Sequence, residues 1–577
     1  MIRVLRLGLW IIMGYGVPFH TSLIAQSTSK SFDGTVHFSS PVRHRVRISG
    51  TFGELRPNHF HAGLDIKSSN GHPGDPVYAM ADGYISRIKI QSGGYGNALY
   101  ITYPGGWTVL YAHLQSFTPE VAQYVKIQQY RLKKFSVNLY PKAGKFQFKR
   151  GEKVGVMGNS GYSFGPHLHL EMRRNNGNLP FNPLRHLDFI KDTIAPVFRS
   201  VKIEGLTPDY RVVTEKKIKV EGKVHFQHLP EDTIDLTAWR AGISIRVYDQ
   251  VNGSSNKNGI YRIKMAIEGK TVYEFVAQSC SFAKTKYVNA HMDYAEQVLH
   301  KQYWHRCYVL PGNHLDMYLK GKEGDVFDLF THRPKHVEIT IEDAAGNTNR
   351  LAFYLRRQEQ IPEPQSRPFH YQLQYDRDNY MSWSDASFFI PKRSLYKNAY
   401  VSVSMTDSPL PTLQIGLKTI PMHRYGTLSV RHLHIADALR PKLILATQDK
   451  NDQLSFGGRW KKDHFECAIN RMGNFYLAID TTPPVITPKN VKKQYRRGEE
   501  ISLEVKDDYK PSGKAKSLRF SGKIDDRWTL IEYDLKYHTL KHVIDEHTAI
   551  GPHTFTLTVK DDRGNKRTFS HRFELTE

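Results

Sequence analysis

Apolar and polar residues alternate, or apolar residues run together, in short segments separated by turn residues along most of the chain. Clear examples are residues 77–85, 96–103, 243–248 and 337–341. Alternation with a period of two is typical of a strand with one buried face, and glycine-containing turns between such strands favour antiparallel pairing. The pattern therefore predicts a mainly β protein built from antiparallel sheets.

One predicted strand, residues 167–173, carries histidines on its polar face. His167, His169 and Glu171 share that face, and the residues between them are apolar. Neutral imidazole is the commonest protein ligand for zinc, so the pair suggests a metal site. Taken alone the signal is weak, because the chain has 28 histidines and residues 432–434 repeat the same His-Leu-His tripeptide. We interpret that second copy as structural, since it lacks a comparable setting between turns.

A histidine and a carboxylate, His61 and Asp65, lie upstream of this strand. In a fully extended strand their side chains would stand about 13 Å apart, too far to share one ion. They can share a metal only if the backbone bends between them, and Gly63 makes a bend easy. His59 is a rival ligand, but the residue four positions beyond it is Gly63, which has no side chain to offer.

Four motifs in order along the chain resemble the LytM/lysostaphin-type zinc endopeptidases, peptidase family M23. They span roughly Phe52 to Arg173, under a third of the chain, and are His61-x-x-x-Asp65, Tyr111-Ala112-His113-Leu114, Gly158-Asn159-Ser160-Gly161 and Gly165-Pro166-His167-Leu168-His169. The resemblance implies an antiparallel-sheet M23 peptidase domain. It further implies that His61, Asp65 and His169 hold one zinc ion per chain, and that His113 and His167 are catalytic.

This assignment is chemically consistent. Three protein ligands leave a fourth zinc position for water, as catalytic sites do, and bound zinc lowers the pKa of that water. The helical His-Glu-x-x-His motif, which supplies a glutamate for proton transfer, is absent. Because imidazole titrates near neutrality, His113 and His167 can transfer protons instead. Glu171 either orients a ligand histidine or is a solvated carboxylate, and the sequence leaves both open.

The N-terminal residues 1–25 are typical of a signal peptide. Arg3 and Arg6 precede an apolar run over residues 7–19, and Ala25 is a plausible cleavage point. A membrane anchor is the alternative, but glycines and a proline interrupt a run already too short to span comfortably. No transmembrane segment is predicted elsewhere. We therefore expect an exported protein, located in the periplasm, at the cell surface or in the medium.

The remaining chain divides by pattern into several segments. The catalytic domain is expected over residues 28–190, with an inserted helix at about 119–147 whose apolar residues have helical spacing. A β-sandwich is expected at 191–357, a Pro- and Glu-rich linker at 358–367, a β-rich domain of uncertain class at 368–479, and an immunoglobulin-like β-sandwich at 480–577.

An internal repeat supports the two sandwiches. The segment 192–196 (Asp-Thr-x-x-Pro) recurs at 480–484, and the strand ending in an acidic Gly-Asn turn at 341–347 recurs at 559–565. Each acidic turn either binds calcium or is simply a hairpin, and the sequence leaves both open.

The net charge of the chain indicates the class of binding partner. With 81 basic and 56 acidic residues, the net charge is +25, which favours polyanions. No zinc finger, helix-turn-helix or RNP pattern accompanies the charge, so we do not expect nucleic-acid binding; an anionic cell wall fits an exported basic protein.

Cys280 and Cys307 could pair and Cys467 would be left over, which is too little for a disulfide scaffold.

Together these observations predict an exported zinc metalloendopeptidase that cleaves peptide cross-links or stems of bacterial peptidoglycan, the substrate being implied by the resemblance. One alternative is a non-catalytic envelope-binding or hydrolase-activating module with the same fold. A third class is an adhesin acting through its sandwiches. Nothing in the sequence predicts an oligomeric state.

Overall fold

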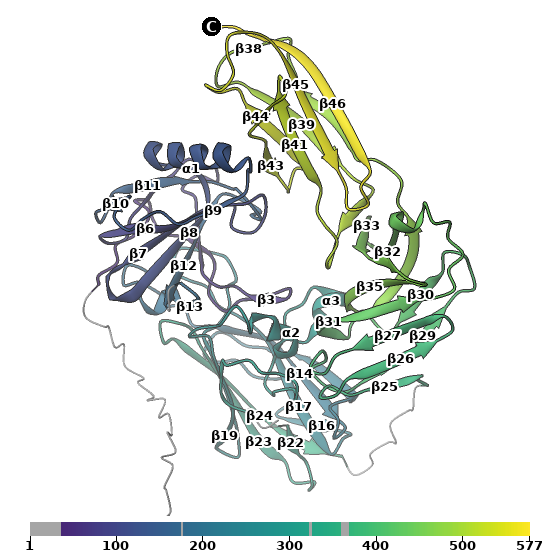
Figure 1. Cartoon of the computed structure of the whole chain (residues 1–577). Helices are drawn as coiled ribbons and strands as arrows, with labels where there is room; N and C mark the ends of the chain where they lie inside the picture. The colour runs from purple at the N-terminus through teal and green to yellow at the C-terminus, as the bar shows by residue number, and fades with distance from the viewer. Residues whose placement is uncertain (1–35, 175–176, 322–325, 359–367) are drawn as a thin grey trace, which may run out of the picture.

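The computed structural model describes residues 36–174, 177–321, 326–358 and 368–577. The predicted signal peptide and all of the predicted linker except Gln358 lie outside these residues. Figure 1 shows four β-rich parts that follow one another round a curve, so that the last part returns to the first. Among the described residues, almost all strand pairs in the nine sheets are antiparallel, the exceptions being three parallel pairs, and this confirms the predicted fold class.

The first part (residues 36–190), which we call the peptidase domain after the family that its motifs resemble, is built on one large sheet. Its central path is β1 (Ile48–Gly50), β4 (Leu64–Lys67), β12 (His167–Arg174), β8 (Trp107–Phe117), β7 (Asn97–Tyr103), β6 (Gly83–Ile90) and β10 (Gln147–Phe148). Shorter strands pair at its margins: β5 (Pro76–Tyr78), β9 (Val137–Leu139), β11 (Lys153–Met157) and β13 (Leu179–Phe181). A separate hairpin, β2 (Leu55–Arg56) with β3 (His59–Phe60), precedes β4.

The insertion after β8 is a helix only in its first half. Helix α1 (Pro119–Leu132) ends where Lys133 adopts the left-handed conformation, with a φ of 50°. Beyond it, the alternating residues of β9 pair with β6, and so does β10. The prediction of a helix over about 119–147 is therefore wrong in its second half, where strand alternation prevails over helical spacing.

The second part, which we call the second domain (residues 191–358), packs two sheets against each other. One contains β15 (Val212–Lys219), β14 (Val197–Leu206), β17 (Arg240–Tyr248), β20 (His305–Arg306) and β22 (Phe327–Asp328). The other contains β16 (Thr233–Leu236), β24 (Thr348–Arg357), β23 (Lys335–Glu342), β18 (Arg262–Ile267), β19 (Lys270–Val276) and β21 (Tyr318–Lys320). Between β19 and β20 lie the 3-10 helix η3 (Thr285–Tyr287) and helices α2 (Val288–His291) and α3 (Tyr294–His300).

The peptidase and second domains share hydrophobic packing. Phe52, Leu55 and Phe60, around the β2–β3 hairpin, belong to the core cluster of the second domain. Conversely, Val251 of the second domain belongs to the core of the peptidase sheet. Because apolar side chains cross the boundary in both directions, the segment leading into His61 is held from outside the peptidase sheet.

The third part (residues 368–480) contains three sheets. They are β25 (Tyr371–Leu373) with β28 (Ala399–Val401); β26 (Asn379–Trp383), β27 (Ala386–Ile390), β31 (Pro421–Val430), β35 (His464–Arg471) and β34 (Arg459–Lys461); and β29 (Val403–Met405), β30 (Thr412–Ile415), β36 (Gly473–Ile479), β32 (Leu443–Asp449), β33 (Asp452–Gly457) and β40 (Tyr509–Pro511). Strand β40 comes from the fourth part, so the last two parts share a sheet.

The fourth part (residues 481–577) is a two-sheet sandwich. Its sheets are β37 (Val485–Asn490), β39 (Glu500–Lys506), β44 (Thr539–Val543) and β43 (Glu532–Asp534), and β38 (Gln494–Tyr495), β46 (Lys566–Leu575), β45 (Gly551–Lys560), β41 (Arg519–Ile524) and β42 (Arg527–Thr529). In Figure 1 this part, coloured yellow, lies beside α1 of the peptidase domain. There the Tyr130 hydroxyl donates to Asp545 over 2.7 Å, and Lys126 pairs with the same carboxylate.

Cys280 and Cys307 do not form the disulfide that the sequence allowed. Both are buried free thiols, as is Cys467, and the first two lie in the core of the second domain. Burial raises the pKa of Cys280 to about 12, so its reactive thiolate is scarcely populated.

Within the described residues, no helix has the length and apolarity needed to cross a membrane.

Candidate active site

Three neighbouring strands of the large sheet carry the predicted site residues. Strand β12 pairs with β4 on one side and with β8 on the other, and His169 stands opposite both Asp65 and Ala112. The apolar side chains Leu168 and Leu170 are fully buried in the sheet's core. Because side chains alternate along a strand, His167, His169 and Glu171 project from the other face, as the sequence predicts.

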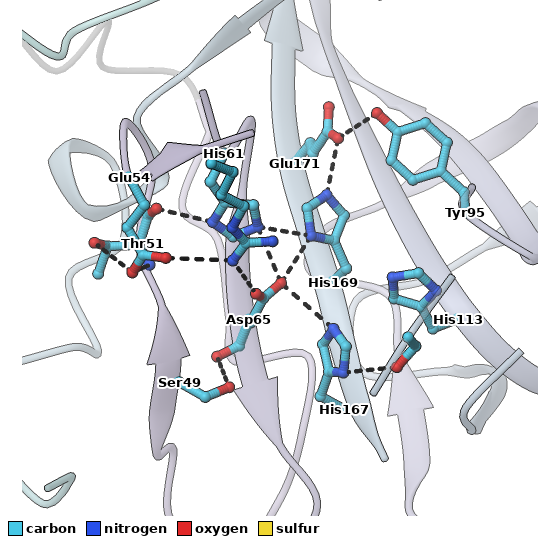
Figure 2. Close-up of polar contacts among 12 residues, drawn as sticks. Ser49, Thr51, Glu54, His61, Asp65, Tyr95, His113, His167, His169 and Glu171 are labelled. Atoms are coloured by element: carbon cyan, nitrogen blue, oxygen red, sulfur yellow. Dashed lines mark hydrogen bonds and ion pairs between the residues drawn. The ribbon is translucent and has the colours of Figure 1, made fainter. Parts of the chain in front are cut away.

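His61, Asp65 and His169 bring three ligand atoms together, as Figure 2 shows. Nε2 of His61 lies 3.0 Å from Nδ1 of His169 and 3.1 Å from Oδ1 of Asp65. The third side of the triangle, from His169 Nδ1 to Asp65 Oδ1, is 2.8 Å. A tetrahedral zinc with bonds of about 2.0–2.1 Å needs ligand atoms a little over 3 Å apart, so these donors fit such an ion.

The bend predicted between His61 and Asp65 is present at Gly63. A Cβ at this position would lie 2.4 Å from the carbonyl oxygen of Leu170 and 3.0 Å from the His169 ring. Only glycine therefore lets the chain pass so close to β12. The His61 ring is fixed from behind, because its Nδ1 donates to the Thr51 carbonyl over 2.8 Å. In the neutral ring, this bond leaves Nε2 as the lone-pair nitrogen that faces the other two ligands.

Asp65 is held as a carboxylate. Its Oδ2 accepts a 2.9 Å hydrogen bond from Arg56, which leaves Oδ1 for the cluster. Burial opposes ionisation, but the charge of His61 and hydrogen bonds from the surrounding histidines hold the pKa of Asp65 well below its usual value. The group is thus in the protonation state that a metal ligand requires.

Glu171 contacts the other ring nitrogen of His169, with Oε1 2.8 Å from Nε2. It is fully buried and is itself held by the Tyr95 hydroxyl at 2.7 Å and by Arg173 at 2.7 Å. Burial opposes both charges, yet the hydrogen bonds to Asp65 and Glu171 raise the pKa of His169 to about 9. The charge of Arg173, together with His169, lowers the pKa of Glu171 to about 2 against its burial. A solvated carboxylate, the alternative left open by the sequence, does not describe this residue.

His113 and His167 face each other beside the ligand cluster, with ring centroids 4.8 Å apart. Nδ1 of His113 donates to the Ser160 carbonyl and Nδ1 of His167 to the Gly165 carbonyl, both over 2.8 Å. In the neutral form of each ring, Nε2 is therefore the proton acceptor. Burial, then the neighbouring His169 and His167, lowers the pKa of His113 to about 3, so its imidazole is neutral at neutral pH.

The backbone of His113 is strained. Its φ of 61° lies in the left-handed region, which is uncommon for a residue other than glycine, and its amide donates to the Tyr95 carbonyl rather than continuing the regular ladder. Such strain is found where surrounding structure over-determines a functional side chain. No feature of the sequence signals it.

The five residues border an open cavity of about 1420 Å³. Part of its wall comes from the second domain, through Phe282, Thr285 and Tyr303. Thr285 is fixed there because its hydroxyl accepts a 2.8 Å hydrogen bond from the Phe60 amide. No sequence pattern predicts this wall, since the two segments are more than 200 residues apart and share no motif.

Two other histidine candidates lie outside the cluster. His59 lines the cavity, but its Nδ1 is bonded to the Pro57 carbonyl and it contributes no atom to the three-ligand group. His432 pairs with Asp385 on the surface of the third part. Among the described residues it belongs to no group of three or more potential metal ligands.

Parts of this chain are similar to known proteins. Residues 59–130 match the model of "Peptidase family M23", and residues 370–480 match that of a "Zu5-like domain". The chain is 34% identical over 144 residues to a "DD-carboxypeptidase/endopeptidase Mpg" of Neisseria meningitidis, covering 24% of this chain and 26% of that protein. It is 30% identical over 166 residues to the "Cell division protein DipM" of Caulobacter vibrioides, covering 29% and 22% respectively.

Among solved structures, the catalytic domain of the M23 protein EnpA from Enterococcus faecalis is 26% identical, with 25% of this chain and 88% of that one covered and a TM-score of 0.18. The chain spans only about a quarter of the length of the curated relatives it matches. The family-model match and the curated relatives show that part of this chain is similar to peptidase family M23.

Proposed function

We propose that this chain is an exported zinc metalloendopeptidase that cleaves peptide cross-links or stems of bacterial peptidoglycan. The observation that carries the proposal is the triangle of His61, Asp65 and His169 ligand atoms, with sides of 2.8 to 3.1 Å, flanked by two further histidines. A binding module that had lost catalysis would not need all five groups. The retention of the complete set therefore favours an enzyme over that alternative.

His61, Asp65 and His169 would hold the zinc ion, and Glu171 would fix the tautomer and direction of the His169 ring. When bound, zinc polarises a carbonyl group and acidifies a coordinated water molecule. The chain's own residues then orient the substrate and move protons. Because His113 is neutral and its Nε2 is an acceptor, it can take a proton from a water molecule in the cavity.

His167 would act on the substrate from a position beside His113. Its Nε2 lies 3.5 Å from Oδ1 of Asp65, close to the ligand group but longer than the contacts among the three ligands. When its ring is protonated, a histidine in this position can donate a hydrogen bond to a carbonyl oxygen that gains negative charge, or return a proton to a leaving amine.

The substrate class is supported by the relatives and by charge. One relative is named as a carboxypeptidase and endopeptidase and another as a cell division protein. A net charge of +25 favours an anionic polymer such as peptidoglycan with its carboxylates. Export rests on residues 1–25, whose composition is typical of a signal peptide.

Zymography on purified peptidoglycan, with and without a zinc chelator, tests the proposal. We expect a cleared band that the chelator removes and added zinc restores. Clearing that is indifferent to the chelator would contradict the zinc mechanism. Binding to peptidoglycan without release of soluble fragments would replace the enzyme by the binding-module alternative.

A further inference from the structure

Three aspartates converge at the junction of the peptidase and second domains, outside the site described above. Asp192 lies in the connection between the domains, Asp249 follows β17, and Asp343 follows β23. One carboxylate oxygen from each lies within 4.8 Å of the others. Acidic groups often gather on surfaces without binding anything, but two features distinguish this group: burial, and polar atoms that lack hydrogen-bond partners.

Asp249 is buried without a hydrogen-bond partner for one oxygen. Its side chain is 3% exposed, and its Oδ1 contacts no donor. Asn258 is 4% exposed, and both polar atoms of its amide also lack partners. The two residues form a directly opposed antiparallel pair, with backbone hydrogen bonds of 3.0 and 2.8 Å, so their side chains lie on the same face. Buried polar groups are rarely left unpaired, because each costs desolvation energy.

The three acids lack a neutralising cation in the part of the chain that the structure describes. Within the described residues, none of Asp192, Asp249 and Asp343 forms an ion pair with a lysine, arginine or histidine. Arg185, which reaches the turn that follows Asp343, donates over 2.8 Å to the carbonyl of Ala344. Burial and then the charge of Asp343 raise the pKa of Asp249 to about 8, and burial raises that of Asp192 to about 6. Buried carboxylates at this separation need a positive charge to remain ionised.

We propose that Asp192, Asp249 and Asp343 bind a calcium ion, with the amide oxygen of Asn258 as a further ligand. All the available donors are oxygens, and no histidine or cysteine belongs to the group. Such a donor set suits a hard cation rather than zinc. Calcium is favoured over magnesium because it accepts irregular carboxylate and amide coordination, whereas magnesium demands a near-ideal octahedron.

The turn after β23 fixes one of the ligands. Oδ1 of Asp343 accepts hydrogen bonds from the amides of Ala345, Gly346 and Asn347 over 2.7 to 2.9 Å. The side chain of Asn347 bonds both to Asp343 and to the carbonyl of Asp192. Two of the three ligand segments are therefore already connected, and the ion would connect the third, at Asp249.

The ion would also strengthen the attachment of the second domain to the zinc-ligand shell. Between Asp249 and Asn258 the chain forms a loop, and Ser254 in this loop donates to the carbonyl of Ile48 in β1 over 2.5 Å. Just beyond it, the Gly259 amide donates to the Thr51 hydroxyl over 3.1 Å. Thr51 is the residue whose carbonyl orients His61. The proposed calcium ion would therefore hold together Asp249 and Asn258, the two ends of a loop that packs beside the active site.

The second copy of the repeat provides a matched control. Its corresponding acids are Asp480, Asp507 and Asp561, but in this copy a lysine, Lys442, contacts the turn asparagine Asn565. Asp507 is only half-buried, and none of these three acids has a buried oxygen without a partner among the described residues. Calcium is therefore expected at the first copy and not at the second.

The test is calcium titration of the full zinc-loaded chain by calorimetry, after removal of free calcium. We expect one calcium per chain, with a dissociation constant on the order of 10⁻⁴ M and much weaker binding of magnesium. Asp249→Asn should weaken calcium binding at least about tenfold, since a charged ligand is lost, while Asp507→Asn should leave it unchanged. Zinc content, measured in parallel, should not change in either variant.

A second measurement keeps the test independent of folding defects. Calcium should slow amide hydrogen exchange in residues 249–259 of the unmodified chain, and Asp192→Asn, which alters a half-exposed side chain, should abolish that protection. Absence of calcium binding at millimolar concentrations would overturn the proposal. So would equal affinity for magnesium, or binding that is lost in Asp507→Asn and retained in Asp249→Asn.

Discussion

Nδ1 of His169 lies 2.8 Å from Oδ1 of Asp65, and the pairing of β12 with β4 sets the two residues directly opposite each other. This relationship joins the two halves of the proposed metal site, which are more than 100 residues apart in the chain. A one-residue slip of either strand would turn its side chain to the other face of the sheet. The site therefore depends on strand register as well as on residue identity.

Loss of any one ligand should empty the zinc site. We expect His61→Ala, Asp65→Ala and His169→Ala each to abolish zinc retention after dialysis, because two ligands are too few to hold the ion. Elemental analysis measures the outcome directly. His432→Ala is the matched control, since this histidine pairs with Asp385 on the surface. The His432→Ala variant should keep one zinc per chain. Stoichiometric zinc in His169→Ala would refute the ligand assignment.

Glu171 should act through the His169 ring. Glu171→Gln keeps the volume but removes the charge that faces Nε2 at 2.8 Å. Loss of such a partner typically weakens metal affinity by about 10- to 100-fold. Competition with a chromophoric chelator measures the change. Glu120→Gln, on the exposed first turn of α1, should have no effect, and an unchanged affinity in Glu171→Gln would remove the positioning role.

Zinc affinity should fall as the pH is lowered below about 9. The folded-state pKa of His169 is raised to about 9 from 6.5, so below that pH zinc must displace a proton from this ring. One displaced proton predicts about a tenfold loss of affinity per pH unit. The stability of the zinc-free protein depends on pH in the opposite direction. The raised pKa of His169 increases the free energy of unfolding below pH 6.5, and this contribution disappears as the pH rises through about 9.

Chelator competition between pH 6.5 and 9 measures the zinc dependence. Glu171→Gln serves as the control, because it removes one of the interactions that raise the pKa of His169. In this variant, the pH below which zinc affinity begins to fall should be lower. A flat profile in the unmodified chain would contradict the assigned protonation state.

The fourth part should separate from the peptidase domain when its contact with α1 is weakened. Tyr130 stacks on His547 with ring centroids 3.7 Å apart and donates to Asp545, and Lys126 pairs with Asp545 at 3.0 Å. We expect Tyr130→Ala to increase the radius of gyration measured by small-angle X-ray scattering. Tyr140→Ala, an exposed tyrosine of the same domain, should leave it unchanged. Equal scattering from the unmodified chain, Tyr130→Ala and Tyr140→Ala would show that this contact does not hold the fourth part against the peptidase domain.

The sequence was sufficient for residues whose placement follows from local periodicity. Alternation along β12 put His167, His169 and Glu171 on one face, and Gly63 indicated the bend that brings His61 to Asp65. The remaining features depend on contacts between distant segments. Arg56, Tyr95 and the second-domain wall at Phe282 reach the site only through the tertiary fold.

Local patterns also failed where two periodicities competed. In the insertion, helical spacing holds for α1, but the following residues pair with β6 as strands. Cys280 and Cys307 illustrate a different limit: both lie in one core, yet they remain free thiols. Disulfide formation requires specific distance and orientation, which the sequence does not contain.

The central claim is that ligand and catalytic histidines have separate roles, and paired measurements of zinc content and peptidoglycan cleavage test it most directly. His113→Ala and His167→Ala should each retain one zinc per chain, because neither residue belongs to the three-ligand group. Their cleavage rates should fall by about 10²- to 10⁴-fold, the usual effect of removing a proton-transfer or oxyanion-stabilising group. His169→Ala should lose both zinc and activity. Near-full cleavage by the zinc-loaded His113→Ala and His167→Ala variants, or loss of zinc from His167→Ala with retention in His169→Ala, would contradict the account.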